Sequence, residues 1–181
     1  MKCDKVITRV MQLLTDPSSN FAYRGNQFKA ESDACSMEDI LGHLDCAGVI
    51  PESLEHDPTE EKLYAKHCDA LPTLGLTKLG LDVEMISERI EAADVWARGH
   101  NCQSVEDAKA FRMSRTTKNQ KDFKIEALNQ CRQGVDYACL VGPDYQYPSS
   151  NSQIYSQIIR YNVPLLSYAH LGFLVCNRNK G

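Results

Sequence analysis

Two acidic residues and a lysine, Asp94, Asp107 and Lys109, form the group with the clearest chemical potential in this sequence. Asp107 and Lys109 are two residues apart in a segment with strand character, so their side chains project from the same face. Asp94 falls in a preceding short strand, and a hairpin would bring it beside Asp107. Two neighbouring carboxylates repel unless a cation neutralises them or one takes up a proton. Mg²⁺ suits such a pair because it prefers oxygen ligands and binds through one or two carboxylates, water and phosphate.

The ammonium group of Lys109 would then lie beside both the metal and a phosphate under attack. It can orient or help to deprotonate the attacking water, and it can offset charge that develops on the phosphate oxygens. The predicted chemistry is therefore metal-assisted hydrolysis of a phosphodiester. Taken alone, the Asp-x-Lys triplet favours an ordinary surface ion pair, so the surrounding sequence has to decide between the two interpretations.

A strongly basic segment begins at Lys109 itself. Residues 109–124 contain six Lys or Arg residues and one Asp, a net charge of +5 in a chain whose overall charge is −4. The bases recur at every third position, so on a helix they would sweep around one broad side. Most charge runs are solvated helix surfaces, but such clusters also attract nucleic-acid backbones. The predicted DNA contacts, mostly to phosphates, are Arg112, Arg115, Lys118, Asn119 and Lys121.

The elements that must position these residues follow from apolar periodicity and capping signals. Helices are expected at 5–14, 36–48, 57–70, 114–132 and 152–161, the third of them ending before Pro72. Strands are expected at 93–97, 102–111, 135–141 and 163–167, the first two as a hairpin and the last two buried, before a short closing helix. Residues 81–91 fit either a strand or a helix.

This order of elements predicts a single α/β domain, residues 1–181, in which helices flank a central mixed β-sheet. Residues 1–56 would form an N-terminal helical part, and residues 57–175 would form the catalytic core.

Composition narrows the protein class further. With 43% apolar and 24% charged residues in 181, the chain fits a globular protein rather than a disordered or fibrous one. It has no apolar stretch long enough to span a membrane. Charged residues interrupt the first helix, where a secretory signal needs an apolar core, so the expected location is cytoplasmic.

The eight cysteines show no CxxC pair or zinc spacing and are expected to be free, mostly buried thiols, with a zinc site or disulfides as the alternative.

A longer pattern extends beyond the triplet. The stretch DAKAFRMSRTTKNQKDFKIEAL at 107–128, followed by DYACL at 136–140, QYP at 146–148 and SQI at 152–154, resembles the HindIII-type restriction endonucleases of the PD-(D/E)xK nuclease superfamily. EKLYAK at 61–66 and ADVWA at 93–97 correspond more loosely. The resemblance covers residues 58–175 and is densest between 105 and 155. It implies the restriction-endonuclease-like core of that superfamily.

The resemblance also implies an activity: a homodimeric type II restriction endonuclease that uses Mg²⁺ to cleave double-stranded DNA at a short palindrome and leaves 5′-phosphate ends. AAGCTT is the first target to test. Asp94, Asp107 and Lys109 fall at catalytic positions, with the two aspartates as metal ligands. Superfamily sites often include an acid from a helix, and the resemblance suggests Glu61 for this role, with Glu60 as the competing choice. The alternative for Glu61 is an exposed acid in the first turn of a helix, stabilised by the helix dipole.

Two other functions stay open at this point. One is a PD-(D/E)xK nuclease of DNA repair or recombination with little sequence specificity. The other is a truncated, catalytically inactive DNA-binding relative, because family members extend beyond the position of Gly181.

Overall fold

The computed structural model describes residues 3–14, 20–54, 58–86, 93–114, 120–132 and 134–178. Its helices are α1 (Cys3–Leu14), α2 (Phe21–Asp33), α3 (Met37–Cys46), α4 (Pro58–Leu79), α5 (Gln120–Phe123), α6 (Ile125–Cys131), α7 (Gln153–Tyr161), α8 (Tyr168–Asn177) and the 3-10 helix η1 (Asp144–Gln146). Its strands are β1 (Val49–Ile50), β2 (Asp82–Met85), β3 (Val95–Arg98), β4 (Gln103–Ala108), β5 (Phe111–Arg112), β6 (Tyr137–Gly142) and β7 (Leu165–Ser167).

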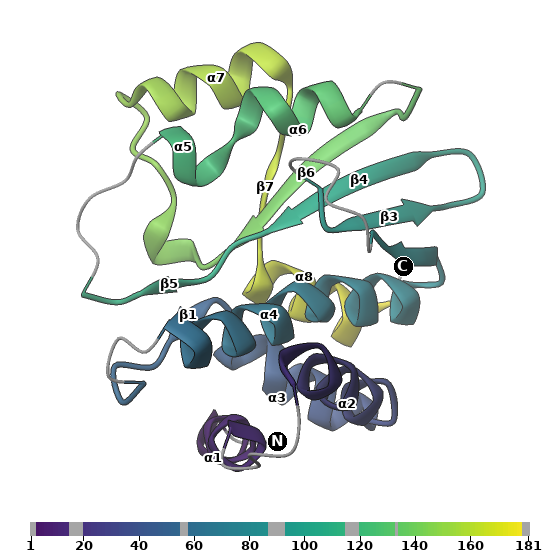
Figure 1. Ribbon diagram of the computed structural model, residues 1–181. Helices are drawn as coiled ribbons and strands as arrows, with labels where there is room; N and C mark the ends of the chain where they lie inside the picture. Colours follow the sequence, from purple (N-terminus) through teal and green to yellow (C-terminus); the bar gives the residue numbers. More distant parts are fainter. Residues whose placement is uncertain are drawn as a thin grey trace.

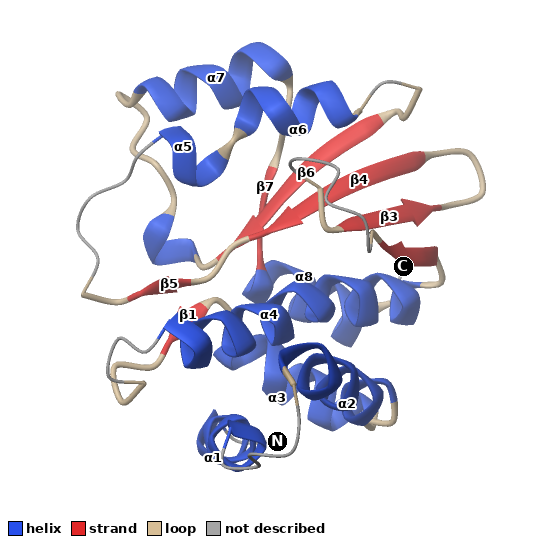
Figure 2. Ribbon diagram, in the orientation of Figure 1, coloured by secondary structure: helices blue, strands red, loops and turns tan. Residues whose placement is uncertain are grey.

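A mixed five-stranded sheet forms the centre, in the order β2-β3-β4-β6-β7 (Figure 2). Strand β3 runs antiparallel to both of its neighbours, β2 and β4, whereas β4, β6 and β7 run parallel to one another. The middle position of β4 gives it hydrogen-bonded neighbours on both sides. The short strands β1 and β5 form a separate parallel pair. The predicted α/β class with a mixed central sheet is confirmed.

Helices cover both faces of the sheet (Figure 1). Helices α6 and α7 lie over one face, and α4 and α8 over the other, with α1, α2 and α3 packed beyond α4. Two buried apolar clusters match these layers: one includes Leu44, Leu71 and Leu171, and the other includes Leu128 and Leu140. Removal of this apolar surface from water is the main force that holds the layers together.

The structure confirms the predicted hairpin and the helices that were expected to begin near Ser36 and Ser152. The predicted hairpin is formed by β3 and β4. The hydroxyl of Ser36 caps α3 by accepting a hydrogen bond from the Asp39 N–H at 3.2 Å. Ser152 caps α7 in the same way, at 3.0 Å from the Tyr155 N–H. Capping satisfies backbone donors that the first helical turn leaves without partners.

The predicted end of a helix before Pro72 is wrong, because α4 continues through Pro72 to Leu79. A proline inside a helix removes the hydrogen bond to the carbonyl four residues earlier, here that of Cys68. In this protein the Cys68 carbonyl accepts a hydrogen bond from the Tyr168 hydroxyl of α8 at 3.4 Å. Burial of Leu71 and Leu74 beside the proline adds packing that favours the continuous helix.

The single helix predicted at 114–132 is also wrong. Lys124 adopts a left-handed conformation with φ 45° and separates α5 from α6. The predicted strand 102–111 divides as well, since β4 ends at Ala108 and β5 pairs with β1. Helix α2 was not predicted, and part of the ambiguous segment 81–91 forms β2. The predicted boundary between the N-terminal part and the core, at residue 57, lies outside the described residues.

Cysteine chemistry differs from the expectation of free thiols at Cys46 and at the cysteine bonded to it. Cys46 is disulfide-bonded, whereas free thiols include those of the buried Cys68 and the exposed Cys102 and Cys176. Spacing along the chain does not reveal which distant cysteines meet, which is why the bond was not predicted. None of the described helices has the length and apolar character needed to cross a membrane.

Candidate active site

The β3–β4 hairpin places Asp94 beside Asp107. Val95 pairs with Glu106, so the next position along this antiparallel ladder sets the two aspartates opposite each other. The Asp94 N–H donates to the Glu106 carbonyl at 2.8 Å, and its Oδ2 accepts a hydrogen bond from the Ala108 N–H at 3.0 Å. The carboxylate of Asp94 is therefore tied to the backbone of the strand that carries Asp107.

Lys109 lies just beyond the end of β4 and turns its ammonium group toward Asp107. Its Nζ donates a hydrogen bond to Asp107 Oδ1 at 2.6 Å and lies 2.6 Å from Oδ2. The Lys109 N–H donates to the Val141 carbonyl at 2.8 Å, and the Lys109 carbonyl accepts from the Tyr168 hydroxyl at 3.2 Å. Both β6 and α8 thus fix the backbone of this lysine. The structure brings Asp94, Asp107 and Lys109 together, and their catalytic roles stay predictions.

Burial dominates the electrostatics of Asp107. Its side chain is 5% exposed, and this burial raises its pKa to about 8. The positive charge of Lys109 opposes that shift, whereas the charge of Asp94 and a close contact with it push the pKa further upward. The site therefore disfavours two negative carboxylates in the absence of an additional positive charge.

A divalent cation with oxygen ligands fits this pair of carboxylates. Asp107 Oδ2 is buried and accepts no hydrogen bond from the described residues, although Lys109 Nζ lies close to it. A cation would add positive charge beside that of Lys109 and neutralise the repulsion between Asp94 and Asp107. Within the described ranges, no group of three or more His, Cys, Asp or Glu side chains is arranged to hold a metal. The protein would thus supply two carboxylates, and water or phosphate would complete the ligands, as is common for Mg²⁺.

Helix α4 contributes a third carboxylate, from Asp69, which the sequence analysis did not single out. Burial and the charge of Asp94 raise the pKa of Asp69 to about 7, while Lys66 and Lys109 lower it. Lys66 Nζ lies 3.3 Å from Asp69 Oδ2. A signal for Asp69 was present in the sequence: it is an acid between apolar residues of a helix, where an exposed acid would not be expected.

Glu61, predicted as the helical acid of the site, lies elsewhere. It precedes Asp69 by eight residues on α4, about 12 Å along the helix at 1.5 Å per residue. One oxygen of its carboxylate accepts hydrogen bonds from Arg112 Nε at 2.8 Å and Nη2 at 2.6 Å. The structure therefore assigns Glu61 to an ion pair with Arg112, and the helical acid near Asp94 and Lys109 is Asp69. For Glu60, the competing choice, the structure gives no contact with the cluster.

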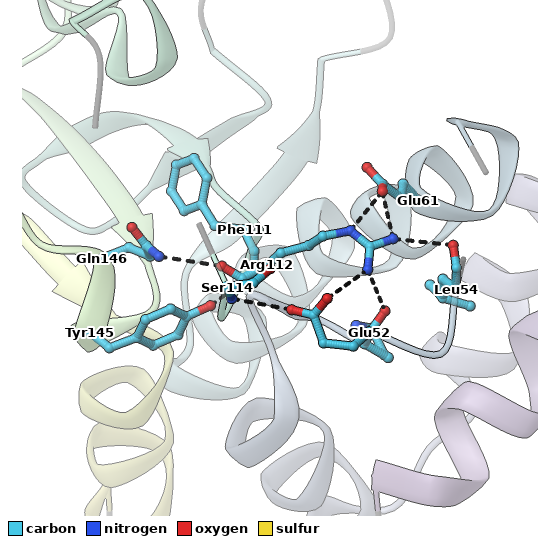
Figure 3. Close-up of polar contacts among 9 residues, drawn as sticks. Glu52, Leu54, Glu61, Phe111, Arg112, Ser114, Tyr145 and Gln146 are labelled. Atoms are coloured by element: carbon cyan, nitrogen blue, oxygen red, sulfur yellow. Dashed lines mark hydrogen bonds and ion pairs between the residues drawn. The ribbon is translucent and has the colours of Figure 1, made fainter. Parts of the chain in front are cut away.

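Arg112, predicted to contact DNA, is turned inward (Figure 3). Its side chain is 8% exposed. Besides Glu61, the guanidinium donates to Glu52 Oε2 at 3.1 Å and to the carbonyls of Pro51 and Leu54 at 3.2 and 3.1 Å. These contacts use all five N–H donors of a guanidinium, so no donor is left for a phosphate. We therefore revise its role from DNA contact to a structural anchor.

The other predicted DNA contacts cannot be placed as side chains. Arg115, Lys118 and Asn119 lie outside the described residues, and Lys121 belongs to α5 with its side chain outside them. Their predicted roles stay as the sequence analysis gave them.

Comparison with known proteins adds a family to this geometry. The sequence model of a family described as HindIII restriction endonuclease matches residues 4–180. The type II restriction enzyme HindIII of Haemophilus influenzae is 42% identical over 142 residues, which cover 77% of this chain and 47% of that enzyme. The chain thus spans about half the length of this curated relative. Among solved structures, restriction endonuclease FokI is similar with a TM-score of 0.45 and 12% identity, over 81% of this chain and 31% of FokI.

Proposed function

The chain belongs to the HindIII restriction endonuclease family, and we propose that it is a Mg²⁺-dependent type II restriction endonuclease that hydrolyses double-stranded DNA. The observation that carries this proposal is the cluster of Asp94, Asp107 and Lys109 at the end of β4, in which Lys109 Nζ lies 2.6 Å from the buried carboxylate of Asp107 and Asp94 is bonded to the same strand. Two carboxylates and a lysine are the groups that metal-assisted phosphodiester hydrolysis needs.

In this proposal Asp94 and Asp107 hold Mg²⁺, which supplies charge stabilisation at the phosphate and makes a bound water easier to deprotonate. Lys109 directs its ammonium group toward the phosphate and the attacking water. The contacts of its backbone with Val141 and Tyr168 keep that group in place. Asp69 has a pKa near neutrality, which suits a group that exchanges a proton with water.

The proposed substrate follows from the family and from charge. The basic residues between 109 and 124 would meet the phosphate backbone. A palindromic site presents the same sequence twice around a twofold axis, which favours a homodimer with one active site for each strand. We propose AAGCTT as the target, 5′-phosphate ends as the product and a cytoplasmic location, where the protein would meet DNA.

A digest of a long DNA of known sequence tests this function. The purified chain is incubated with the DNA and Mg²⁺, and the cut ends are mapped by sequencing and by direct ligation, which requires a 5′-phosphate. Discrete fragments that end at AAGCTT support the proposal. Matched reactions contain a chelator or Ca²⁺; Ca²⁺ is expected to permit binding without cleavage because of its looser coordination geometry.

Other outcomes of the same digest separate the alternatives. A smear, or nicks without sequence preference, would indicate a repair or recombination nuclease. Salt-sensitive DNA binding without Mg²⁺-dependent cleavage, in a sample shown to be folded, would indicate a catalytically inactive relative. Discrete cuts at another palindrome would keep the restriction activity and change only the recognised sequence.

A further inference from the structure

The buried guanidinium of Arg112 is the centre of a set of polar contacts (Figure 3). We call Arg112, together with Glu52, Glu61 and Ser114, the arginine clamp. Arg112 joins β5 to the N-terminal turns of α4 through Glu61, and to the loop before α4 through Glu52. Glu52 has a second partner, because its Oε1 accepts a hydrogen bond from the Ser114 N–H at 3.2 Å. These bonds lower the pKa of Glu52, Ser114 contributing most and Arg112 also contributing.

The backbone of β5 is also held by Gly48, which directly precedes β1, and by residues that follow β6. The Phe111 N–H donates to the Gly48 carbonyl at 2.8 Å, and the Phe111 carbonyl accepts from the Tyr145 hydroxyl at 2.8 Å. The Arg112 carbonyl accepts from the Gln146 side chain at 3.4 Å. Chain segments that are far apart in the sequence therefore converge on a strand of two residues.

The location of β5 gives this anchoring a consequence for the proposed site. Phe111 follows Lys109 by two residues, and Ser114 directly precedes the first of the bases Arg115, Lys118 and Lys121. Arg112 and Ser114 of the clamp lie between Lys109 and those bases in the sequence. The clamp fixes the position of Ser114, the last described residue before those bases.

We propose that Arg112 is a positioning residue, which together with Glu52 and Glu61 aligns the basic segment after Ser114 with DNA phosphates relative to Lys109. This inference rests on the proposed DNA-cleaving function. Arginine suits the task because its planar group reaches two carboxylates and two carbonyls at once, which a lysine ammonium cannot do. Displacing one partner of a buried ion pair leaves the other charge uncompensated, so the clamp disfavours any other position of this part of the chain.

The test measures DNA binding and cleavage separately. Glu52→Gln and Arg112→Lys are compared with the wild type and with Glu38→Gln, an exposed acid of α3. Affinity for an AAGCTT duplex is measured with Ca²⁺ over a range of salt concentrations, and single-turnover cleavage at saturating protein is measured with Mg²⁺. Glu52→Gln is the milder variant because the side chain of Glu52 is 52% exposed.

We expect both clamp variants to raise Kd about fivefold or more. They should also reduce the magnitude of the slope of log K against log salt by about 1 to 2, because each lost phosphate contact reduces that slope by about 0.9. The single-turnover rate at saturation should stay unchanged. A purely structural role would lower the melting temperature without changing the salt slope. Glu38→Gln should match the wild type in every measurement.

Three results would overturn the inference. An unchanged Kd and salt slope in folded Glu52→Gln and Arg112→Lys proteins would remove the positioning role while leaving the nuclease proposal intact. A lower saturated rate with an unchanged Kd would place the clamp in catalysis instead. Failure of the wild type to bind or cleave DNA would instead refute the proposed function, and the positioning role would fall with it.

Discussion

Lys109 and Asp107 form a buried ion pair, with Lys109 Nζ 2.6 Å from both oxygens of the carboxylate. The lysine side chain is 17% exposed, so its charge is directed into the protein rather than toward bulk water. Such a partner favours the ionised form of Asp107 against the opposing effect of burial. The pair therefore holds together the carboxylate and the ammonium group that the proposed mechanism requires.

Replacement of Lys109 by alanine is expected to abolish DNA cleavage while most DNA binding remains. Loss of a positioned acid–base or charge-stabilising group costs about 10²- to 10⁴-fold in rate. Single-turnover cleavage with Mg²⁺ and affinity with Ca²⁺ measure the two effects separately. Lys78→Ala, at the far end of α4, serves as the matched control. Unimpaired cleavage by Lys109→Ala would remove this lysine from the mechanism.

Asp107→Asn is expected to weaken Mg²⁺ binding and to shift the cleavage titration to metal concentrations at least about tenfold higher, because a charged oxygen ligand is replaced by a neutral amide. The measurement is the cleavage rate as a function of Mg²⁺ concentration. Asp94→Asn should act in the same direction. The control is Asp45→Asn, an exposed position on α3. An unchanged titration in Asp107→Asn would contradict the proposed pair of ligands.

Comparison of Asp69→Asn with Glu61→Gln identifies which acid of α4 serves the site. Asp69 interacts with the charges of Asp94 and Lys109, whereas Glu61 is bonded to Arg112. We expect Asp69→Asn to lower the saturated cleavage rate about tenfold or more, at the lower end of what acid–base groups contribute. Glu61→Gln should leave that rate unchanged and alter DNA affinity. The reverse pattern would restore the assignment made from the sequence.

A pair of buried histidines makes the stability of the protein sensitive to acid. His43 Nδ1 and His67 Nε2 lie 3.1 Å apart, and burial lowers the pKa of both, that of His67 from 6.5 to about 3. Between these pH values the unfolded chain binds a proton at His67 that the folded chain does not. The stability that the neutral His67 allows is fully present above pH 6.5. As the pH falls from 6.5 toward 3, His67 lowers the free energy of unfolding by about 1.4 kcal/mol for each pH unit.

Denaturant unfolding on both sides of pH 6.5 tests this effect through the difference between the wild type and His67→Gln. The comparison is needed because the raised pKa values of Asp69, Glu106 and Asp107 give contributions of the opposite sign. The variant should lose less stability on acidification than the wild type does. His100→Gln, in an exposed turn, should show no such change. Equal pH dependence in all three proteins would exclude His67 as the source.

Part of the site could be predicted because it depends on local rules. Asp107 near the end of β4 and Lys109 just beyond it are two residues apart in extended chain, where side chains alternate between faces, so both lie on the same side. A short turn then brings the strand of Asp94 alongside, and no other part of the chain is needed. The same reasoning explains why the hairpin was predicted correctly.

The errors arise where a distant segment decides the outcome. Pro72 remains inside a helix because Tyr168, far along the chain, donates a hydrogen bond to the freed Cys68 carbonyl. Arg112 fits a regular spacing of bases, yet carboxylates and carbonyls from residues 51–61 turn it inward. Charge and spacing describe how bases are distributed along the chain and not what they meet in the folded protein.

The sequence by itself determined the α/β class, the strand that carries Asp107 and leads to Lys109, and the family, because these depend on periodicity, on residue type and on order along the chain. Only the tertiary structure decided that Asp69 stands near Asp94 while Glu61 and Arg112 bind each other. These choices depend on how α4 is seated against the sheet and on which buried charges find partners, and burial makes an unpartnered charge too costly to leave in place.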